Sequence, residues 1–150
     1  EHRPSHVLAL SSPGSEPPPV AAGHRLALVF HDIAAPGAGL VAPDAEAIRR
    51  LLAFGAGWPG TRPLLVHCRM GISRSPAAAL ILAAAALAER PEAVLAEALR
   101  EAAPCATPNP LMIALADRIL GREGRLIAAA RAIGRGADYR PYRLASLTLA

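Results

Sequence analysis

A cysteine and an arginine lie six positions apart in the stretch HCRMGISRS, residues 67–75. Once deprotonated, the thiol of Cys68 can act as a nucleophile. Arg74 presents a planar fork of donors that can bind two phosphoryl oxygens at once, an arrangement that lysine cannot copy. Gly71 fits a turn with positive φ or a close backbone approach. The stretch therefore predicts a loop that holds a phosphate group beside a nucleophilic sulfur.

Coincidence explains the spacing of these residues poorly. At the residue frequencies of this chain, the pattern His-Cys-x-x-Gly-x-x-Arg would arise by chance in roughly one of two thousand chains of this length. A cysteine and an arginine that merely fall near a glycine are therefore the weaker interpretation.

The elements on either side would position this loop. Leu64–His67 is a short apolar run bounded by turn residues, which is typical of a buried parallel strand. Pro76 stands where the first turn of a helix tolerates proline, and the 12 residues 77–88 are all apolar. Since a bilayer span needs about 18–20 residues, this run predicts a buried helix and no membrane span. A loop between a strand and a helix N-terminus favours an anion, and we expect this field and Arg74 to lower the pKa of Cys68.

The remaining elements predict one α/β domain over residues 1–150. Strands are expected at His6–Leu10 and Arg25–Phe30, and helices from Pro43, from Pro91 and over residues 108–120 and 123–133. Strands that alternate with helices, followed by helices alone, indicate a central, mainly parallel sheet flanked by helices, with a helical C-terminal half. We expect residues 121–150 to form a helical, basic extension. Since the chain opens with Glu1, its natural N-terminus is expected to lie upstream.

Composition and charge narrow the class of protein. The 150 residues are 53% hydrophobic and 19% charged, as in a soluble globular domain. Residues 117–150 carry seven arginines and three acids and so account for the net charge of +4. A basic tail can attract an anionic partner, but no aromatic residues interleave with these arginines, so we expect no nucleic-acid partner. Cys68 and Cys105 form no disulfide framework and indicate reduced thiols in a cytoplasm.

Residues 67–75 resemble the His-Cys-x5-Arg-Ser/Thr signature of cysteine-dependent protein tyrosine phosphatases. The surroundings are similar to the compact, dual-specificity-like branch, which includes bacterial members. The resemblance covers about Arg25 to Leu120, where RLALVFHDI resembles the strand leading to the acid loop and ATPNPLMIAL resembles the later Pro-Asn segment. It implies a mainly parallel sheet with helices on both sides. It also implies phosphomonoester hydrolysis through a cysteinyl-phosphate, without a metal or another cofactor.

The resemblance also implies roles for individual residues. Cys68 would be the nucleophile, Arg74 would bind the phosphoryl group, and Ser75 would donate a hydrogen bond to the sulfur. His67 and Asn109 would brace the loop. The backbone amides that would complete the phosphate cradle belong to Arg69, Met70, Gly71, Ile72, Ser73 and Arg74.

The proton donor for the leaving oxygen is expected upstream of the loop. Asp32 ends a strand candidate 36 residues before Cys68, near where the family places its general acid. Asp44, 24 residues before Cys68, is more typical of a helix N-cap. His31 is a possible substitute for Asp32. Asn109, between two prolines, fits a helix N-terminus as well as a loop brace.

Other side chains leave two interpretations each. Cys105 is either a partner for a disulfide with Cys68 or a small buried thiol, the simpler view. Trp58 and Met70 either shape the pocket entrance or pack against the fold.

The implied substrate is protein phosphotyrosine, with phosphoserine and phosphothreonine as further possibilities. The alternatives are a phosphoinositide or another small phosphomonoester, and a non-catalytic phosphate-binding module. Apolar Met70 and Ile72 inside the loop weigh against a polyphosphorylated headgroup, and the Gly-x-x-Arg-Ser ending weighs against a rhodanese. The sequence carries no signal for an oligomeric state.

Overall fold

The structure of the protein, a computed structural model, describes residues 3–141 and 144–149. Within these residues the chain forms three strands and five helices. In chain order they are β1 (His6–Ser11), β2 (His24–Val29), α1 (Ala45–Ala56), β3 (Leu64–His67), α2 (Arg74–Ala86), α3 (Glu92–Ala102), α4 (Pro110–Ile119) and α5 (Arg125–Ala132).

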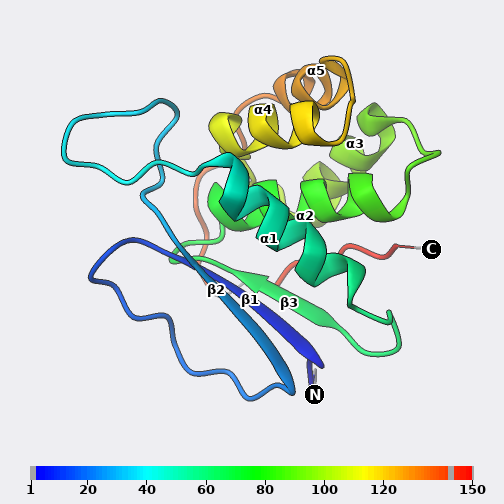
Figure 1. Ribbon diagram of the computed structural model, residues 1–150. Helices are drawn as coiled ribbons and strands as arrows, with labels where there is room; N and C mark the ends of the chain where they lie inside the picture. Colours follow the sequence, from blue (N-terminus) through cyan, green and yellow to red (C-terminus); the bar gives the residue numbers. More distant parts are fainter. Residues whose placement is uncertain (1–2, 142–143, 150) are drawn as a thin grey trace.

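The three strands form a parallel sheet, as the sequence predicts, and their order is β2-β1-β3 (Figure 1). Ala9 of β1 lies opposite Ala27 of β2 on one side and His67 of β3 on the other. The central strand β1 is buried at every position, whereas the edge strand β2 buries only Leu28 fully. Because the strands run in the same direction, their carboxyl ends meet at one edge of the sheet. That edge is where the loop after His67 begins.

The helices gather on one side of the sheet in Figure 1. Helix α1 packs against β2, helix α2 packs against β3, and the two helices contact each other. Helix α4 packs on both α1 and α2, helix α3 packs on α2, and helix α5 packs on α3 and α4. The resemblance implied helices on both faces, and the described residues differ from that expectation. The reason is topological, because the connection from β1 to β2 contains no helix and the crossover through α1 lies against α2.

Helix α2 lies at the centre of the helical layer. Buried side chains occur all along it and include Ala77, Leu80 and Ile81, which confirms the buried helix expected from the apolar run. Helix α1 approaches it closely at Gly55, where a Cβ atom would overlap the side chain of Leu82. In the part of the chain that the structure describes, no helix has the length and apolar character needed to cross a membrane.

The prediction of a helical extension over residues 121–150 is wrong over most of that segment. In the described residues only α5 is helical there. Gly134, with φ +60°, follows the end of α5, and Pro141 lies downstream. Both residues oppose helix continuation. Leu147 and Leu149 are half-buried and pack against the core, so the segment returns to the domain without helical structure. Residues 142, 143 and 150 of the expected extension lie outside the described residues.

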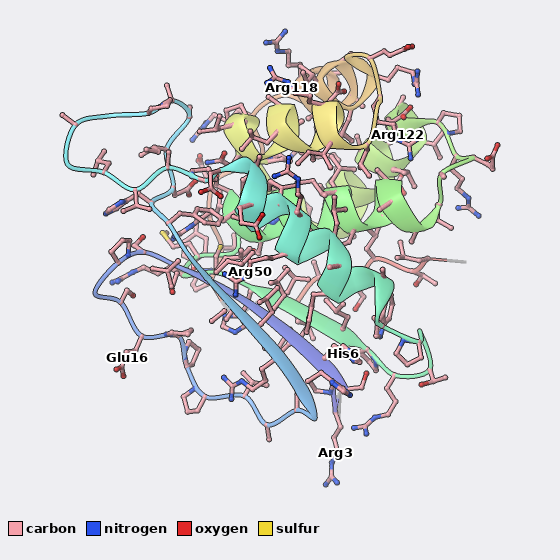
Figure 2. The ribbon with its side chains drawn as sticks, viewed as in Figure 1. Arg3, His6, Glu16, Arg50, Arg118 and Arg122 are labelled. Atoms are coloured by element: carbon pink, nitrogen blue, oxygen red, sulfur yellow. The ribbon has the colours of Figure 1, made fainter. Side chains whose placement is uncertain are left out.

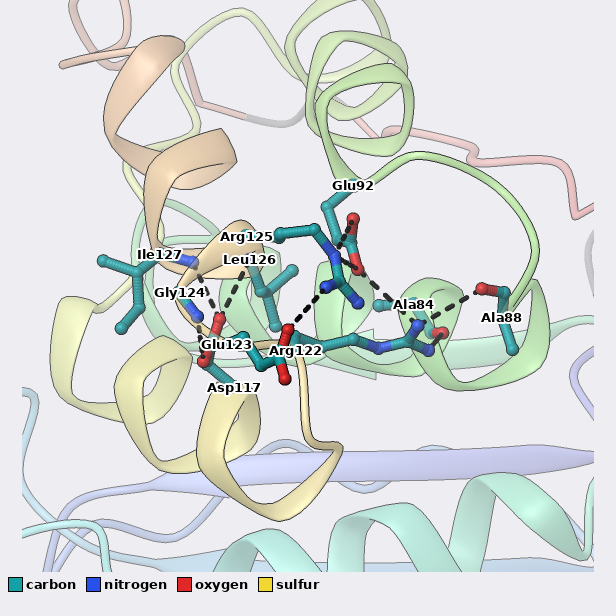
Figure 3. Close-up of polar contacts among 10 residues, drawn as sticks. All are labelled: Ala84, Ala88, Glu92, Asp117, Arg122, Glu123, Gly124, Arg125, Leu126 and Ile127. Carbon is teal, nitrogen blue, oxygen red and sulfur yellow. Dashed lines mark hydrogen bonds and ion pairs between the residues drawn. The ribbon is translucent and has the colours of Figure 1, made fainter.

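A half-buried arginine, with 12% of its side chain exposed, connects the ends of several helices (Figure 3). The guanidinium of Arg122 donates to the carbonyl of Ala84 (2.7 Å) and to that of Ala88 (3.2 Å), so it caps the C-terminal end of α2. It also lies 3.6 Å from the buried carboxylate of Glu92. Figure 2 shows the contrast with Arg118, whose side chain extends from α4 away from the molecule. Arg122 therefore acts as a structural residue.

We predict that Asp117→Ala lowers the free energy of unfolding by about 2–4 kcal/mol. The buried carboxylate accepts hydrogen bonds from three backbone N–H groups at the start of α5, those of Gly124 (2.8 Å), Leu126 (3.0 Å) and Ile127 (3.4 Å). Alanine would leave these donors without an acceptor. Urea unfolding followed by circular dichroism measures the change. Asp138→Ala, which removes only an exposed ion pair, is the matched control, and an equal loss in both variants would contradict the prediction.

Candidate functional site

A cavity of about 250 Å³ lies at the carboxyl edge of the sheet. It joins the loop after β3 to one residue that follows β2. Gly71 and Ser75, also expected in the site, belong to the same loop but do not line the cavity. The lining residues are Asp32, Cys68, Arg69, Met70, Ile72, Ser73 and Arg74.

The backbone of the loop is held from outside the cavity. Gly71 has φ +71°, a conformation that side-chain-bearing residues rarely adopt. The carbonyl of Ile72 accepts a hydrogen bond from the N–H of Thr107 (2.7 Å), and that of Ser73 accepts one from the N–H of Asn109 (3.2 Å). These two hydrogen bonds fix the backbone of the loop on the side away from the cavity lining. Sequence reasoning missed Thr107, because backbone partners leave no residue-type signal.

The Cys68 sulfur lies among hydrogen-bond donors. Burial by itself raises the pKa of the thiol, but the Ser75 hydroxyl and the backbone N–H groups of Ser75, Gly71 and Met70 outweigh it, so the pKa is lowered. The Ser75 Oγ lies 3.2 Å from the sulfur, and the Gly71 N–H donates to it at 3.3 Å. The lowering comes from these donors, where the sequence suggested the helix field and the charge of Arg74. The thiolate form of Cys68 is therefore favoured more strongly than that of an ordinary cysteine.

Arg74, the first residue of α2, is buried beneath the loop. Its Nη1 donates to the Ser12 hydroxyl (3.0 Å) and to the Phe30 carbonyl (2.8 Å), so the ends of β1 and β2 fix the guanidinium. Its Nε is buried without a hydrogen-bond partner. A buried donor without an acceptor is costly, so an anion that reached this edge of the guanidinium would be stabilised. The sequence did not reveal Ser12, which stands in a Ser-Pro-Gly loop with no spacing signal.

Asp32 is hydrogen-bonded to the loop that follows β3. Its Oδ1 accepts hydrogen bonds from the Ser73 hydroxyl (2.7 Å) and from the Asn109 amide (2.8 Å). The same amide donates to the Ile33 carbonyl (3.0 Å), and the Asn109 Oδ1 caps α4 by accepting from the Met112 N–H (3.0 Å). Asn109 is thus the N-cap residue of α4, and its backbone N–H also contacts the loop. No hydrogen bond from a described residue reaches the Asp32 Oδ2.

Three other candidates lie away from the cavity lining. Asp44 is the N-cap of α1, where it accepts from the Ala47 N–H at 2.8 Å. Trp58 lies between α1 and β3 and donates through Nε1 to the Arg62 carbonyl at 2.7 Å. Cys105 is a half-buried free thiol, as is Cys68, so the two form no disulfide in this structure. Met70 differs from these, because it lines the cavity and is 50% exposed.

His67 ends β3 directly before the nucleophile. Burial lowers the pKa of its ring, the nearby charge of Arg25 lowers it further, and a hydrogen bond with the Cys68 backbone opposes the change. The neutral ring is therefore favoured. Its Nε2 is buried without a hydrogen-bond partner. These features suit a packing role beside the loop better than a role as a cation.

His31 closes the loop that carries Asp32. Its backbone N–H donates to the Val41 carbonyl (2.7 Å), and the Val41 N–H donates back to the His31 Nδ1 (2.9 Å). This Nδ1 must be unprotonated to accept. The sequence left His31 as a substitute proton donor, but it does not line the cavity. In the structure His31 instead joins the two ends of the loop 31–41 through its hydrogen bonds with Val41, a pair of contacts called the latch below.

The assembled site has three chemical capabilities. It can bind a tetrahedral anion through Arg74 and backbone N–H groups, attack it with the Cys68 sulfur, and exchange a proton through Asp32. Among residues 3–141 and 144–149, no group of three or more His, Cys, Asp or Glu side chains is arranged to hold a metal ion.

Comparison with known proteins adds no family to these observations. No protein-family model matches the chain, and no curated protein matches its sequence. The functional assignment therefore depends on the residues of the site.

Proposed function

We propose that this protein is a cysteine-dependent phosphatase that hydrolyses phosphotyrosine in proteins. The observation that carries the proposal is a sulfur with lowered pKa in the same cavity as a buried arginine whose Nε has no partner. The first group supplies the nucleophile, and the second needs an anion. The signature of residues 67–75 connects the pair to phosphate chemistry.

In the first step the phosphoryl oxygens bind the Nε edge of Arg74 and the loop N–H groups. The Cys68 thiolate attacks phosphorus, and the bond from phosphorus to the leaving oxygen breaks. Asp32, protonated at the start, gives its proton to that oxygen. The products are the free alcohol or phenol and a cysteinyl-phosphate.

In the second step water attacks the phosphorus of the cysteinyl-phosphate. The Asp32 carboxylate takes a proton from the water, and the bond between sulfur and phosphorus breaks. The Ser75 hydroxyl, 3.2 Å from the sulfur, donates a hydrogen bond to the departing thiolate. Inorganic phosphate leaves, and Asp32 is again protonated for the next cycle.

The character of the cavity wall favours an aryl phosphate. Met70 and Ile72 offer apolar surface to an aromatic ring, and Arg69 is the only further arginine in the lining. A polyphosphorylated headgroup would need more cationic partners than the lining supplies. We therefore expect phosphotyrosine peptides to be better substrates than phosphoinositides, and we expect slower turnover of phosphoserine and phosphothreonine.

The purified full chain should hydrolyse a generic aryl phosphate, and vanadate should inhibit the reaction. Acid quenching during turnover of a phosphotyrosine peptide labelled on phosphorus should trap the label on Cys68. The same assay on phosphoserine peptides and phosphoinositide vesicles ranks the substrate classes. If the chain binds phosphate but shows no turnover, the non-catalytic phosphate-binding module is the correct interpretation. If phosphate is released faster from phosphoinositides than from phosphotyrosine peptides, the proposed substrate class is wrong.

His31→Phe should slow the hydrolysis of aryl phosphates with poor leaving groups by about 10-fold. Phenylalanine keeps the ring but removes the Nδ1 acceptor of the Val41 N–H, so the loop that carries Asp32 loses its latch. An activated phenol leaves without a proton, so its phosphate should be hydrolysed at nearly the original rate. The dependence of kcat on the pKa of the leaving phenol measures the effect.

Two further variants define the scale of that experiment. His31→Asn provides an amide oxygen near the position of Nδ1 and should retain most of the rate. Asp32→Asn removes the proton donor itself and sets the full loss for poor leaving groups. An equal slowing of all phenols by His31→Phe would show that the variant perturbs the loop of Cys68 instead of Asp32.

A further inference from the structure

A second cavity, of about 280 Å³, lies between the start of α4 and helix α5. Its surface is mainly apolar, with one cationic side chain. Ile113 and Pro108 are buried, whereas Pro110 and Arg131 are exposed. The residues that form most of its lining are Pro108, Pro110, Ile113, Ile127, Ala130 and Arg131.

This second cavity shares a wall with the phosphate-binding cavity. Thr107 lines the second cavity, and its N–H donates to the carbonyl of Ile72, which lines the first (2.7 Å). On the opposite side the Gly136 N–H donates to the Thr107 hydroxyl (3.0 Å). An extended peptide advances about 3.3 Å per residue. A peptide held by its phosphate would therefore reach the second cavity within a few residues.

The charge at the rim indicates what the second cavity would accept. Arg131 is exposed, and its guanidinium makes no hydrogen bond or ion pair with any described residue. Arg125 on the same helix and Arg135 beyond it both pair with carboxylates. An apolar hollow with an unpaired guanidinium at its edge complements an apolar side chain that has a carboxylate beside it.

We propose that the second cavity is a docking subsite for phosphoprotein substrates. It takes an apolar side chain from the segment that flanks the phosphorylated residue, while an adjacent Asp or Glu pairs with Arg131. The inference rests on the proposed function, since it places the phosphorylated residue at Cys68. It adds a preference for sequence around that residue, which the phosphate-binding loop alone does not supply.

A peptide panel tests this subsite. Phosphotyrosine peptides with a Leu-Glu pair moved through each flanking position are compared with p-nitrophenyl phosphate, which is too small to reach the second cavity. One position should raise kcat/KM for the peptide, and replacing that pair by Gly-Gln should remove the gain. Arg131→Glu should lower the ratio of peptide to p-nitrophenyl phosphate kcat/KM about 5-fold, and a Leu-Lys pair should restore part of it.

Two more variants make the test specific. Ala130→Phe fills the cavity and should lower the same ratio without a change in charge. Arg118→Glu makes the same charge reversal on an arginine that extends away from the molecule in Figure 2, outside the cavity lining, and should leave the ratio unchanged. Equal effects of the Arg118 and Arg131 reversals would overturn the subsite in favour of a general charge effect.

Binding measurements separate failure of the subsite from failure of the proposed function. Fluorescence anisotropy with labelled phosphotyrosine peptides reports affinity even if the wild-type chain shows no turnover. If wild-type turnover is present and neither Arg131→Glu nor Ala130→Phe weakens peptide binding, the subsite is overturned and the phosphatase stands. If sedimentation shows a dimer that Arg131→Glu dissociates, the cavity serves a second copy of the chain, and the docking proposal is also overturned.

Discussion

Cys68→Ser is expected to abolish the turnover of phosphomonoesters, with a loss of at least about 10³-fold in kcat. A serine hydroxyl stays protonated at neutral pH, whereas the donors around the Cys68 sulfur lower the pKa of the thiol. The variant keeps Arg74 and the loop N–H groups, so its affinity for vanadate or phosphate should largely survive. Steady-state kinetics and isothermal titration calorimetry measure the two quantities separately.

The pH dependence of alkylation provides an independent check on Cys68. Because its pKa is lowered, the thiolate persists to lower pH, and iodoacetamide should modify it at pH values where an ordinary thiol reacts slowly. Cys105, a half-buried free thiol elsewhere in the chain, is the internal reference. Phosphate should protect Cys68 alone. If both cysteines react with the same pH profile, or if Cys68→Ser retains turnover, the assignment of the nucleophile is wrong.

Arg74→Lys is expected to lower kcat/KM by about 10³-fold although the positive charge is kept. The guanidinium donates through Nη1 to Ser12 and to the Phe30 carbonyl, whereas its Nε has no partner and in the proposed mechanism would contact the phosphoryl group. A lysine ammonium has one nitrogen and cannot do both. Kinetics with a phosphotyrosine peptide, together with thermal unfolding of the variant, distinguish lost chemistry from lost folding.

Ser12→Ala is the matched control for the arginine. It removes one of the two contacts that orient Nη1 but leaves the guanidinium in place, so we expect a loss of only a few-fold. A lysine variant that folds normally and retains a tenth of the activity would show that Arg74 supplies charge alone. Equal losses in both variants would mean that orientation, more than phosphate binding, is what the arginine provides.

The loop could be predicted from the sequence because its parts are local. Residues 67–75 combine a strand end, a turn glycine and a helix start within nine positions, and each part has its own residue-type signal. The three strands and five helices were expected near their observed positions, since apolar patterning and prolines mark them. Asp32 was assigned by resemblance, and the structure brings it to the same cavity as Cys68.

The contacts that hold the loop in place could not be predicted from the sequence, because most of them involve backbone N–H and C=O groups, which every residue type other than proline carries. The Phe30 carbonyl that orients Arg74 and the Thr107 N–H that holds Ile72 are backbone atoms, whose partners only the fold determines. The latch between His31 and Val41 likewise spans ten positions without a motif. The expected helix over the C-terminal segment failed for a different reason, because Gly134 and Pro141, both visible in the sequence, oppose continuation of the helix after α5.

The contacts of Arg74 bear on when the candidate site forms during folding. Its guanidinium bridges the ends of two strands that lie 62 and 44 positions earlier in the chain. A growing chain that ends after α2 already contains both partners of these contacts. Residues 107–109, which hold the backbone of the loop, are added later. Under the proposed function, phosphate binding would therefore require the complete domain, and we expect catalytic activity to disappear in denaturant in one cooperative step with the fold.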